Sequence, residues 1–241
     1  MPLPIPTLTE GRVTIRPIRV RDARPLEREL IANRAWLRQW EASDPRGGAA
    51  FDVRASIRSL QQNARAGGGV PFLIDWDGEL AGQLNISNIG YGSLSSGSIG
   101  YWVSERYAGR GITPVSVALA TDHAFFDLGL HRIEICIRPE NRPSLRVVEK
   151  LGFRYEGLRR RFIHINGDWR DHFCFALVAE EVPRGVLRRY LDGSVPSDVG
   201  LPTDADQRAS RRSGLSGPPD GAGVPPTGSR LIRDPHGHTY P

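Results

Sequence analysis

The sequence predicts an α+β fold with one mixed β-sheet of about seven strands, flanked by helices. Strand-like and helix-like hydrophobic patterns alternate along the first part of the chain, and glycine-containing turn signals separate them. The composition then changes sharply near Leu191. We therefore expect one folded domain over residues 1–190 and a disordered C-terminal tail over residues 191–241.

The predicted helices carry apolar side chains on one face, and several of them begin at a capping residue or end at glycine. They span residues 22–32, 35–40, 53–66, 112–127 and 141–151. The predicted strands alternate apolar and polar residues, and Asp77-Gly78 and Asn166-Gly167 join two pairs of them as two-residue turns. These strands span residues 13–18, 71–76, 79–87, 98–103, 131–138, 154–165 and 169–178.

The predicted tail is rich in residues that resist regular structure. Sixteen of its 51 residues are Gly or Pro, and Tyr240 is its one aromatic residue. Such a segment buries too little apolar area to offset the entropy that it would lose on ordering. Its five Arg and six Asp nearly cancel, so the formal charge of +5 belongs to the folded part.

The composition also limits the class of protein. A charge of +5 suits an anionic cofactor or an acidic surface such as RNA, but it is too small to argue for nucleic-acid binding by itself. No segment has the roughly 18 consecutive apolar residues of a membrane helix, and the first residues lack the pattern of a secretion signal. We therefore expect a cytoplasmic protein that does not enter a membrane.

Two cysteines, Cys136 and Cys174, each lie in a strand-like segment. We expect both to be buried thiols, because a reducing compartment keeps such residues unpaired. No cluster of Cys and His has the spacing of a zinc site, so the sequence predicts no metal.

Residues 106–113 carry the strongest chemical signal, and they lie between a predicted strand and a predicted helix. Gly109 and Gly111 let the backbone curl so that several N–H groups point into one concavity, and the helix adds the positive end of its dipole. Together these features make an anion site, to which Arg106 and Arg110 can add contacts with phosphate oxygens. A tight turn that uses glycine only for its shape is an equally good interpretation of the glycines alone.

Further motifs follow this loop in a consistent order. The loop matches the pattern R/Q-x-x-G-x-G/A, and residues 141–144 (N-R-P-S) precede residues 149–153 (E-K-L-G-F). This combination resembles the GNAT acetyltransferase superfamily, and particularly its RimJ/RimL branch, which acetylates the N-termini of ribosomal proteins. The resemblance covers roughly residues 10–180 and implies a GNAT-like sheet. Shorter matches lie at residues 16–17, 33–40, 99–102 and 132–134.

By this resemblance the chain uses acetyl-CoA as its co-substrate. The pyrophosphate is expected on residues of the glycine loop, namely Arg106, Ala108, Gly109, Arg110, Gly111, Ile112 and Thr113. Backbone groups of Trp102, Val103 and Ser104 are the expected contacts from the preceding strand. Pro114 departs from the pattern of the branch, and it removes one N–H group that could hold a phosphate.

The resemblance also implies two roles near the reacting atoms. Asn141 would bind an amide of the pantetheine arm, because a side-chain amide both donates and accepts hydrogen bonds. Ser144 would lie near the thioester sulfur and donate a proton to it as it leaves. Both residues are also good capping residues close to a predicted helix start, so that interpretation stays open.

The general base has a weaker signal in the sequence. An α-amine has a pKa of about 7.7–8.0, against about 10.4 for lysine, so an N-terminal acceptor needs only a weak base such as a water held by a carboxylate. Glu134 is the candidate, and Asp75 and Glu156 are weaker ones. The alternative for Glu134 is a structural ion pair with a neighbouring arginine.

The leading hypothesis is an enzyme that transfers the acetyl group of acetyl-CoA to a primary amine by direct attack in a ternary complex. The favoured acceptor is the N-terminal α-amine of a ribosomal protein, with association with the ribosome. The alternatives are acetylation of a small amine, such as an antibiotic, a polyamine or an amino acid, and a non-catalytic module that binds acetyl-CoA. Proteins of this branch are often monomers or homodimers, and the sequence does not choose between these states.

Overall fold

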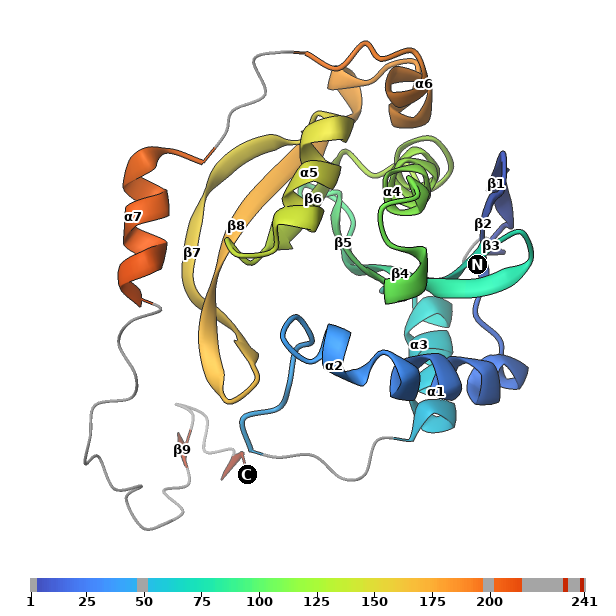
Figure 1. Cartoon of the computed structure of the whole chain (residues 1–241), viewed down its shortest axis with the longest axis horizontal. Coiled ribbons are helices and arrows are strands. Elements are labelled where there is room, and N and C mark those ends of the chain that lie inside the picture. Colours follow the sequence, from blue (N-terminus) through green and yellow to red (C-terminus); the bar gives the residue numbers. More distant parts are fainter. Residues whose placement is uncertain (1–3, 47–51, 197–201, 214–231, 234–238, 241) are drawn as a thin grey trace.

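The computed structural model describes residues 4–46, 52–196, 202–213, 232–233 and 239–240. Its main element is an eight-stranded mixed β-sheet with helices on both faces (Figure 1). The predicted α+β fold is therefore confirmed. The sheet has one strand more than expected, because β1 (Leu8–Glu10) adds an antiparallel edge next to β2. This strand has only three residues, too few for a clear alternation of apolar and polar side chains.

The strands follow the order β1-β2-β3-β4-β5-β6-β8-β7 across the sheet. Every neighbouring pair is antiparallel except β5 with β6, which is parallel. Beyond β1, the strands of this sheet are β2 (Val13–Pro17), β3 (Val70–Trp76), β4 (Glu79–Gly90), β5 (Ser96–Val103), β6 (Arg132–Ile137), β7 (Arg154–Ile165) and β8 (Asp168–Val178). Two short strands, β9 (Ile232–Arg233) and β10 (Thr239–Tyr240), pair with each other.

The helices lie close to their predicted ranges. A 3₁₀ turn at Val20–Asp22 precedes α1 (Ala23–Ala32), and α4 (Ile112–Asp122) continues as a π-helix over His123–Asp127. The other helices with a predicted counterpart are α2 (Arg34–Leu37), α3 (Val53–Arg65) and α5 (Arg142–Leu151). Two more helices, α6 (Val186–Leu191) and α7 (Asp204–Ser213), follow the last strand of the sheet.

The parallel pairing of β5 with β6 ends early. It joins Ser96–Ser98 to Arg132–Glu134, and beyond these residues the two strands are no longer paired. Because the strands are parallel, both run toward the same edge of the sheet and leave an opening there. α4 follows β5 and α5 follows β6, so the N-termini of both helices lie at this opening.

The two faces of the sheet bury different helices. Alternate residues of β3 show this directly, because Phe72 belongs to the large core that includes α4 and α5, whereas Leu73 belongs to a smaller core. Leu26 of α1 and Ile57 of α3 complete that smaller core. α4 is buried on nearly every side, since it contacts the sheet, α5 and α6.

Within the predicted tail, the structure describes the helix α7. Thr203 caps this helix, because its Oγ1 accepts a hydrogen bond from the Asp206 N–H at 3.1 Å. The helix packs against β7, and its Ser210 is only 5% exposed. Composition could not reveal this helix, because its stabilisation comes from docking rather than from its own sequence. Within the predicted tail, residues 197–201, 214–231, 234–238 and 241 lie outside the described part of the chain.

The partly buried carboxylate of Asp122 docks α6 on α4, and it provides a test of this arrangement. Asp122 Oδ1 accepts a hydrogen bond from Val186 N at 2.6 Å, and Oδ2 accepts one from Leu187 N at 3.1 Å. Asp122→Ala should lower the free energy of unfolding by about 1–3 kcal/mol, because both donors lose their acceptor. Urea denaturation measures this loss. The control is Asp192→Ala, which removes an exposed ion pair with Arg188 and should cost about 0–1 kcal/mol. Equal losses would contradict the docking role of Asp122.

Candidate active site

A cavity of about 340 Å³ lies at the opening between β5 and β6. The end of β5 lines one side of it, and the glycine loop with the first turn of α4 lines the next. The first turns of α5 form the opposite side, and residues of α2 and the segment after it cover the cavity. Three parts of the chain that are far apart in the sequence therefore meet here.

The glycine loop has the backbone curl that its sequence predicts. Gly109 and Gly111 have φ angles of +78° and +77°, which favour glycine over any residue with a side chain. Gly111 is also the N-cap of α4, and no side chain caps this helix. The N–H groups of Ile112 and Thr113 therefore have no partner within the helix. All four residues line the cavity, as Ala108 does, so its wall offers backbone donors to an anion.

The two arginines of the loop lie differently from the expectation. Arg106 Nη2 lies 2.5 Å from Glu29 Oε1, and its guanidinium lies over the Tyr107 ring, 4.7 Å from the centroid. Arg110 lies 5.8 Å from the centroid of the same ring. Tyr107 lines the cavity, whereas neither arginine does. On the side of the glycine loop, the cavity is therefore lined by the loop backbone and Tyr107, and not by the two arginines.

Among the expected contacts on the strand, Trp102 and Val103 line the cavity and Ser104 does not. Ser104 is fully buried, and its Oγ donates to Glu29 Oε2 at 2.7 Å. Its N–H is also used, because it donates to the Ala81 carbonyl at 2.8 Å. Ser104 therefore joins the strand to α1 in this structure, and its expected contact with the cofactor stays a prediction.

α2 lies over the end of β5 through a side chain that the sequence analysis did not assign to the site. Trp36 Nε1 donates a hydrogen bond to the Val103 carbonyl at 3.2 Å, and the Trp36 ring lines the cavity. Trp40 lines the same wall. Two tryptophans so close in sequence were the available signal, since aromatic side chains often line ligand cavities.

Asn141 and Ser144 both line the cavity, and the structure distinguishes their capping roles. Asn141 is the N-cap of α5, because its Oδ1 accepts a hydrogen bond from Ser144 N at 3.2 Å. The cap uses only the Asn141 Oδ1 atom, so the Nδ2 group can donate a hydrogen bond to an amide of a ligand. Ser144 does not cap the helix, so its hydroxyl is available to the cavity.

Tyr101 is a further residue of this wall that the sequence analysis missed. Its hydroxyl is buried and meets no described group at hydrogen-bond geometry. Burial raises the pKa of Tyr101 to about 12, and the nearby Ser144 hydroxyl offsets part of the rise. A phenol that stays protonated therefore lies directly behind Ser144.

The candidate bases all lie in ion pairs with arginine, and none of them lines the cavity. Glu134 Oε1 lies 2.7 Å from Arg159 Nη1, and its Oε2 lies 3.2 Å from Arg132 Nη2. Asp75 pairs with Arg16 at 2.6 Å. The hydrogen bond from Arg132 lowers the pKa of Glu156, which makes this carboxylate a poorer proton acceptor. The geometry therefore supports the ion-pair interpretation of Glu134.

The two cysteines are free and lie opposite each other on β6 and β8. Their Sγ atoms are 2.9 Å apart, and Cys136 is only half-buried. With Glu134 they form a group whose ligand atoms lie within 4.8 Å of one another, which spacing along the chain could not reveal. The Arg159 guanidinium already occupies the carboxylate of this group, and positive charge there disfavours a cation.

The charge of the main cavity matches an anionic ligand. Two basic residues of α5 line the cavity. Arg146 lies in the first turns of the helix, and Lys150 lies near its end. The described residues that line it include no Asp or Glu. Backbone donors and two cations thus face a space that negative groups can enter, as the pyrophosphate of acetyl-CoA requires.

The comparisons with known proteins agree with this geometry. The family described as "Acetyltransferase (GNAT) domain" matches residues 12–154. This chain belongs to the GNAT family. It is an acetyl-CoA-dependent N-acetyltransferase. The cavity between the glycine loop, the opening of the sheet and the first turn of α5 is therefore the candidate active site.

Named relatives define the branch of the family. The structure of Mycobacterium smegmatis RimJ in complex with CoA-disulfide is 40% identical, with a TM-score of 0.71, over 76% of this chain and 89% of that one. The [ribosomal protein uS5]-alanine N-acetyltransferase of Escherichia coli is 29% identical over 72% of this chain and 91% of its own length. The probable N-acetyltransferase YjcK of Bacillus subtilis is 41% identical over 42% of this chain, and the match spans only 56% of YjcK.

The helices of the structure bear on the expectation that the protein does not enter a membrane. No helix among the described residues has both the length and the apolar character that crossing a bilayer requires.

The glycine loop gives a direct test of cofactor binding. A Cβ at Gly111 would meet only the Tyr190 hydroxyl, at 3.9 Å, so the space beside this residue is open to a ligand. Gly111→Val should therefore abolish acetyl-CoA binding in calorimetry, because the side chain would fill the anion site. The control is Gly129→Val, which has a similar φ of +67° and open surroundings but lies outside the cavity. Both variants should lose a similar few kcal/mol of stability, of order 1–3. Wild-type affinity in Gly111→Val would disprove the anion site.

Proposed function

We propose that this enzyme acetylates the N-terminal α-amine of a protein. The observation that carries the proposal is the lack of an acidic side chain among the described residues that line the cavity. An amine attacks only in its neutral form, so a site without a carboxylate base suits an amine that is already partly neutral. The names of its relatives, which include a ribosomal-protein alanine acetyltransferase, agree with this substrate class.

The ordinary pKa values of amines distinguish the possible acceptors. With a pKa of about 7.7–8.0, roughly a tenth of an α-amine is neutral at pH 7. With a pKa of about 10.4, well under a thousandth of a lysine amine is neutral. A polyamine carries several such strongly basic groups, and the cationic wall of this cavity opposes it. Acetylation of a small amine of lower pKa stays the alternative.

The reaction is a direct transfer within one complex of the enzyme, acetyl-CoA and the amine. The amine nitrogen attacks the thioester carbonyl carbon, so a C–N bond forms and the C–S bond breaks. Backbone donors at the end of β5, near Val103, stabilise the negative charge on the carbonyl oxygen. Water that enters the cavity takes the proton from the amine.

Ser144 donates a proton to the sulfur as it leaves. Its hydroxyl faces the cavity, since Asn141 and not Ser144 caps α5. Burial raises the pKa of Tyr101 to about 12, so the phenol near Ser144 stays protonated. Ser144 regains its proton from the water in the cavity that took one from the amine. Both hydroxyls are therefore in the protonation state that acid catalysis at the sulfur needs.

An acceptor screen tests the function. Peptides with a free N-terminus should be acetylated faster than the same peptides with a blocked N-terminus and one lysine, and faster than spermidine. The kcat/KM for the free peptide should rise with pH and level off above about 8, because it follows the α-amine pKa of about 7.7–8.0. Turnover of small amines alone would disprove the proposal, and no turnover of any amine would indicate a non-catalytic module.

Ser144→Ala tests the proton donor. It should lower kcat by roughly 10²-fold with little change in the KM for acetyl-CoA, because the group acts mainly in the transition state. Its melting temperature should be nearly unchanged. The matched variant Asn141→Ala removes the helix cap and should cost roughly 1 kcal/mol of stability. If Ser144→Ala turns over normally, the thiolate leaves without this proton.

A further inference from the structure

The two cysteines of the chain lie next to each other on the sheet. Cys136 on β6 is directly opposite Cys174 on β8 in the antiparallel register, and the two Sγ atoms are 2.9 Å apart. They are the only cysteines of the sequence, and they are 38 positions apart along the chain. Both are free thiols in this structure. The function proposed above uses neither of them.

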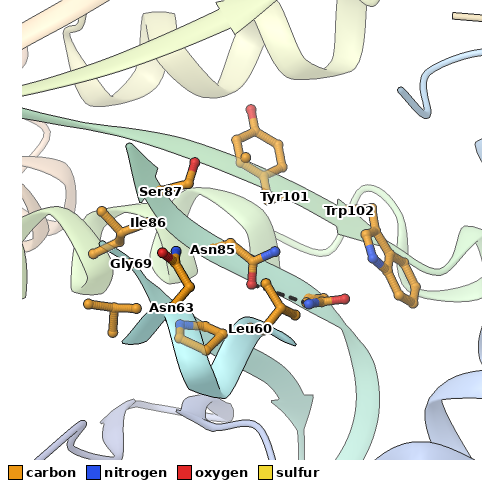
Figure 2. Close-up of a pocket in the computed structure, with 12 residues that line it drawn as sticks. Leu60, Asn63, Gly69, Asn85, Ile86, Ser87, Tyr101 and Trp102 are labelled. Atoms are coloured by element: carbon orange, nitrogen blue, oxygen red, sulfur yellow. Dashed lines mark hydrogen bonds between the residues drawn. The ribbon is translucent and has the colours of Figure 1, made fainter. Parts of the chain in front are cut away.

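The cysteine pair lies at the opening of the sheet, on the face away from the large core. Ile135 and Ile137, on either side of Cys136, belong to that core, so the Cys136 side chain points to the opposite face. The last residue of β6 that pairs with β5 is Glu134, two positions before Cys136. Across the opening, the same face of the sheet borders a second cavity of about 230 Å³ between α3, β4 and β5 (Figure 2). Neither cysteine lines the cofactor cavity, so the pair is a separate chemical feature.

The backbone at the cysteine pair already has the spacing that a disulfide requires. Directly opposite residues of an antiparallel pair have Cα atoms about 4.5 or 5.5 Å apart. A disulfide joins residues whose Cα atoms are usually about 4.4–6.8 Å apart, so both spacings lie within this range. β6 and β8 are paired without interruption from Arg132 to Ile137. A bond between the two sulfurs therefore requires no movement of the strands.

A charged neighbour favours a thiolate in the cysteine pair. Arg159 on β7 has its Nη1 3.7 Å from Cys136 Sγ and 2.7 Å from Glu134 Oε1. Its positive charge offsets the Glu134 carboxylate, which lies 3.4 Å from the same sulfur. The hydrogen bond from Cys136, and then the charge of Arg159, lower the pKa of Cys174, although burial opposes them.

The hydrogen bond between the two sulfurs has the opposite effect on the other cysteine. It raises the pKa of Cys136, and burial raises this pKa further. The pair therefore releases one proton and keeps the second. This state combines a thiolate, which is the form of cysteine that attacks an oxidant, with a thiol next to it. Cys136 is only half-buried, so a small molecule can approach the pair from solvent.

We propose that Cys136 and Cys174, with Arg159 beside them, form a site of reversible oxidation at which hydrogen peroxide converts the two thiols to a disulfide. One thiolate attacks a peroxide oxygen, so an S–O bond forms, the O–O bond breaks, and the hydroxide that leaves takes up a proton to become water. The second sulfur then attacks the sulfenic acid, so the S–S bond forms, the S–O bond breaks and a second water leaves. Together the two sulfurs lose two electrons, and the peroxide gains them. A dithiol reductant reverses the oxidation by exchange.

Peroxide treatment of the folded, full-length chain tests the site. The reduced protein is mixed with glutathione and hydrogen peroxide, then denatured and alkylated, and its intact mass is measured. Neither cysteine should be alkylated, the mass should fall by two hydrogen atoms, and dithiothreitol should restore both thiols. Alkylation of both cysteines after the added glutathione has been oxidised would overturn the proposal. Disulfide-linked dimers in place of an internal bond would also overturn it.

Single variants separate the internal disulfide from other products of oxidation. Cys136→Ser and Cys174→Ser each leave one thiol, so neither can lose two hydrogen atoms within one chain. In at least one of them, dimedone should capture the sulfenic acid that has no second thiol to react with. Wild-type protein should give little dimedone adduct, because the second cysteine consumes the sulfenic acid. As much adduct in the wild type as in the variants would overturn the role of the pair.

Arg159→Leu tests the charge beside the pair. It should slow disulfide formation about threefold or more, because the Glu134 carboxylate then disfavours the thiolate without an opposing charge. Arg160→Leu is the matched control, since it removes the adjacent and exposed arginine of the same strand. Its rate should equal that of the wild type. Equal rates in the two arginine variants, each folded, would overturn the part of the proposal that includes Arg159.

Discussion

The short parallel contact between β5 and β6 is the constraint on which the site depends. Beyond Ser98, the backbone of β5 has no strand partner on the β6 side, so its polar groups there must find other partners. Trp36 satisfies the Val103 carbonyl in this structure, and the amides of the pantetheine arm are chemically suited to the remaining groups. Because β5 and β6 separate at this point, the first turns of α4 and α5 lie at the same opening of the sheet.

A carboxylate on α1 holds the end of β5 in place. Glu29 pairs with Arg106 through one oxygen and accepts a hydrogen bond from the buried Ser104 hydroxyl through the other. Asn33, at the end of the same helix, accepts a hydrogen bond from Glu105 N at 2.8 Å. The glycine loop is thus tied to α1 before any ligand binds. This arrangement leaves backbone N–H groups, which need no charge, to receive the pyrophosphate.

Two cavities flank the end of β5, and they differ in the charge of the residues that line them. The cofactor cavity has Arg146 and Lys150 on its wall, as an anionic ligand needs. The described residues that line the second cavity, between α3, β4 and β5, carry no charge, and they include Asn63, Gln83 and Asn85. Neither cavity has a described carboxylate, so neither favours a cationic acceptor. The proposed α-amine acceptor agrees with both.

The sequence by itself determined the sheet, its main helices, the glycine loop and the positions of Asn141 and Ser144, because each depends on local patterns such as alternation, turns and capping. It could not determine which polar and charged side chains face a ligand. Arg106, Ser104 and Glu134 all have suitable chemistry, yet their partners lie on other elements, at Glu29 and Arg159. Nor could it reveal the second cavity beside β5, since Asn63, Asn85 and Gly100 meet only when α3, β4 and β5 pack. Tertiary contacts decided these matters because partners distant in the sequence compete for the same polar groups.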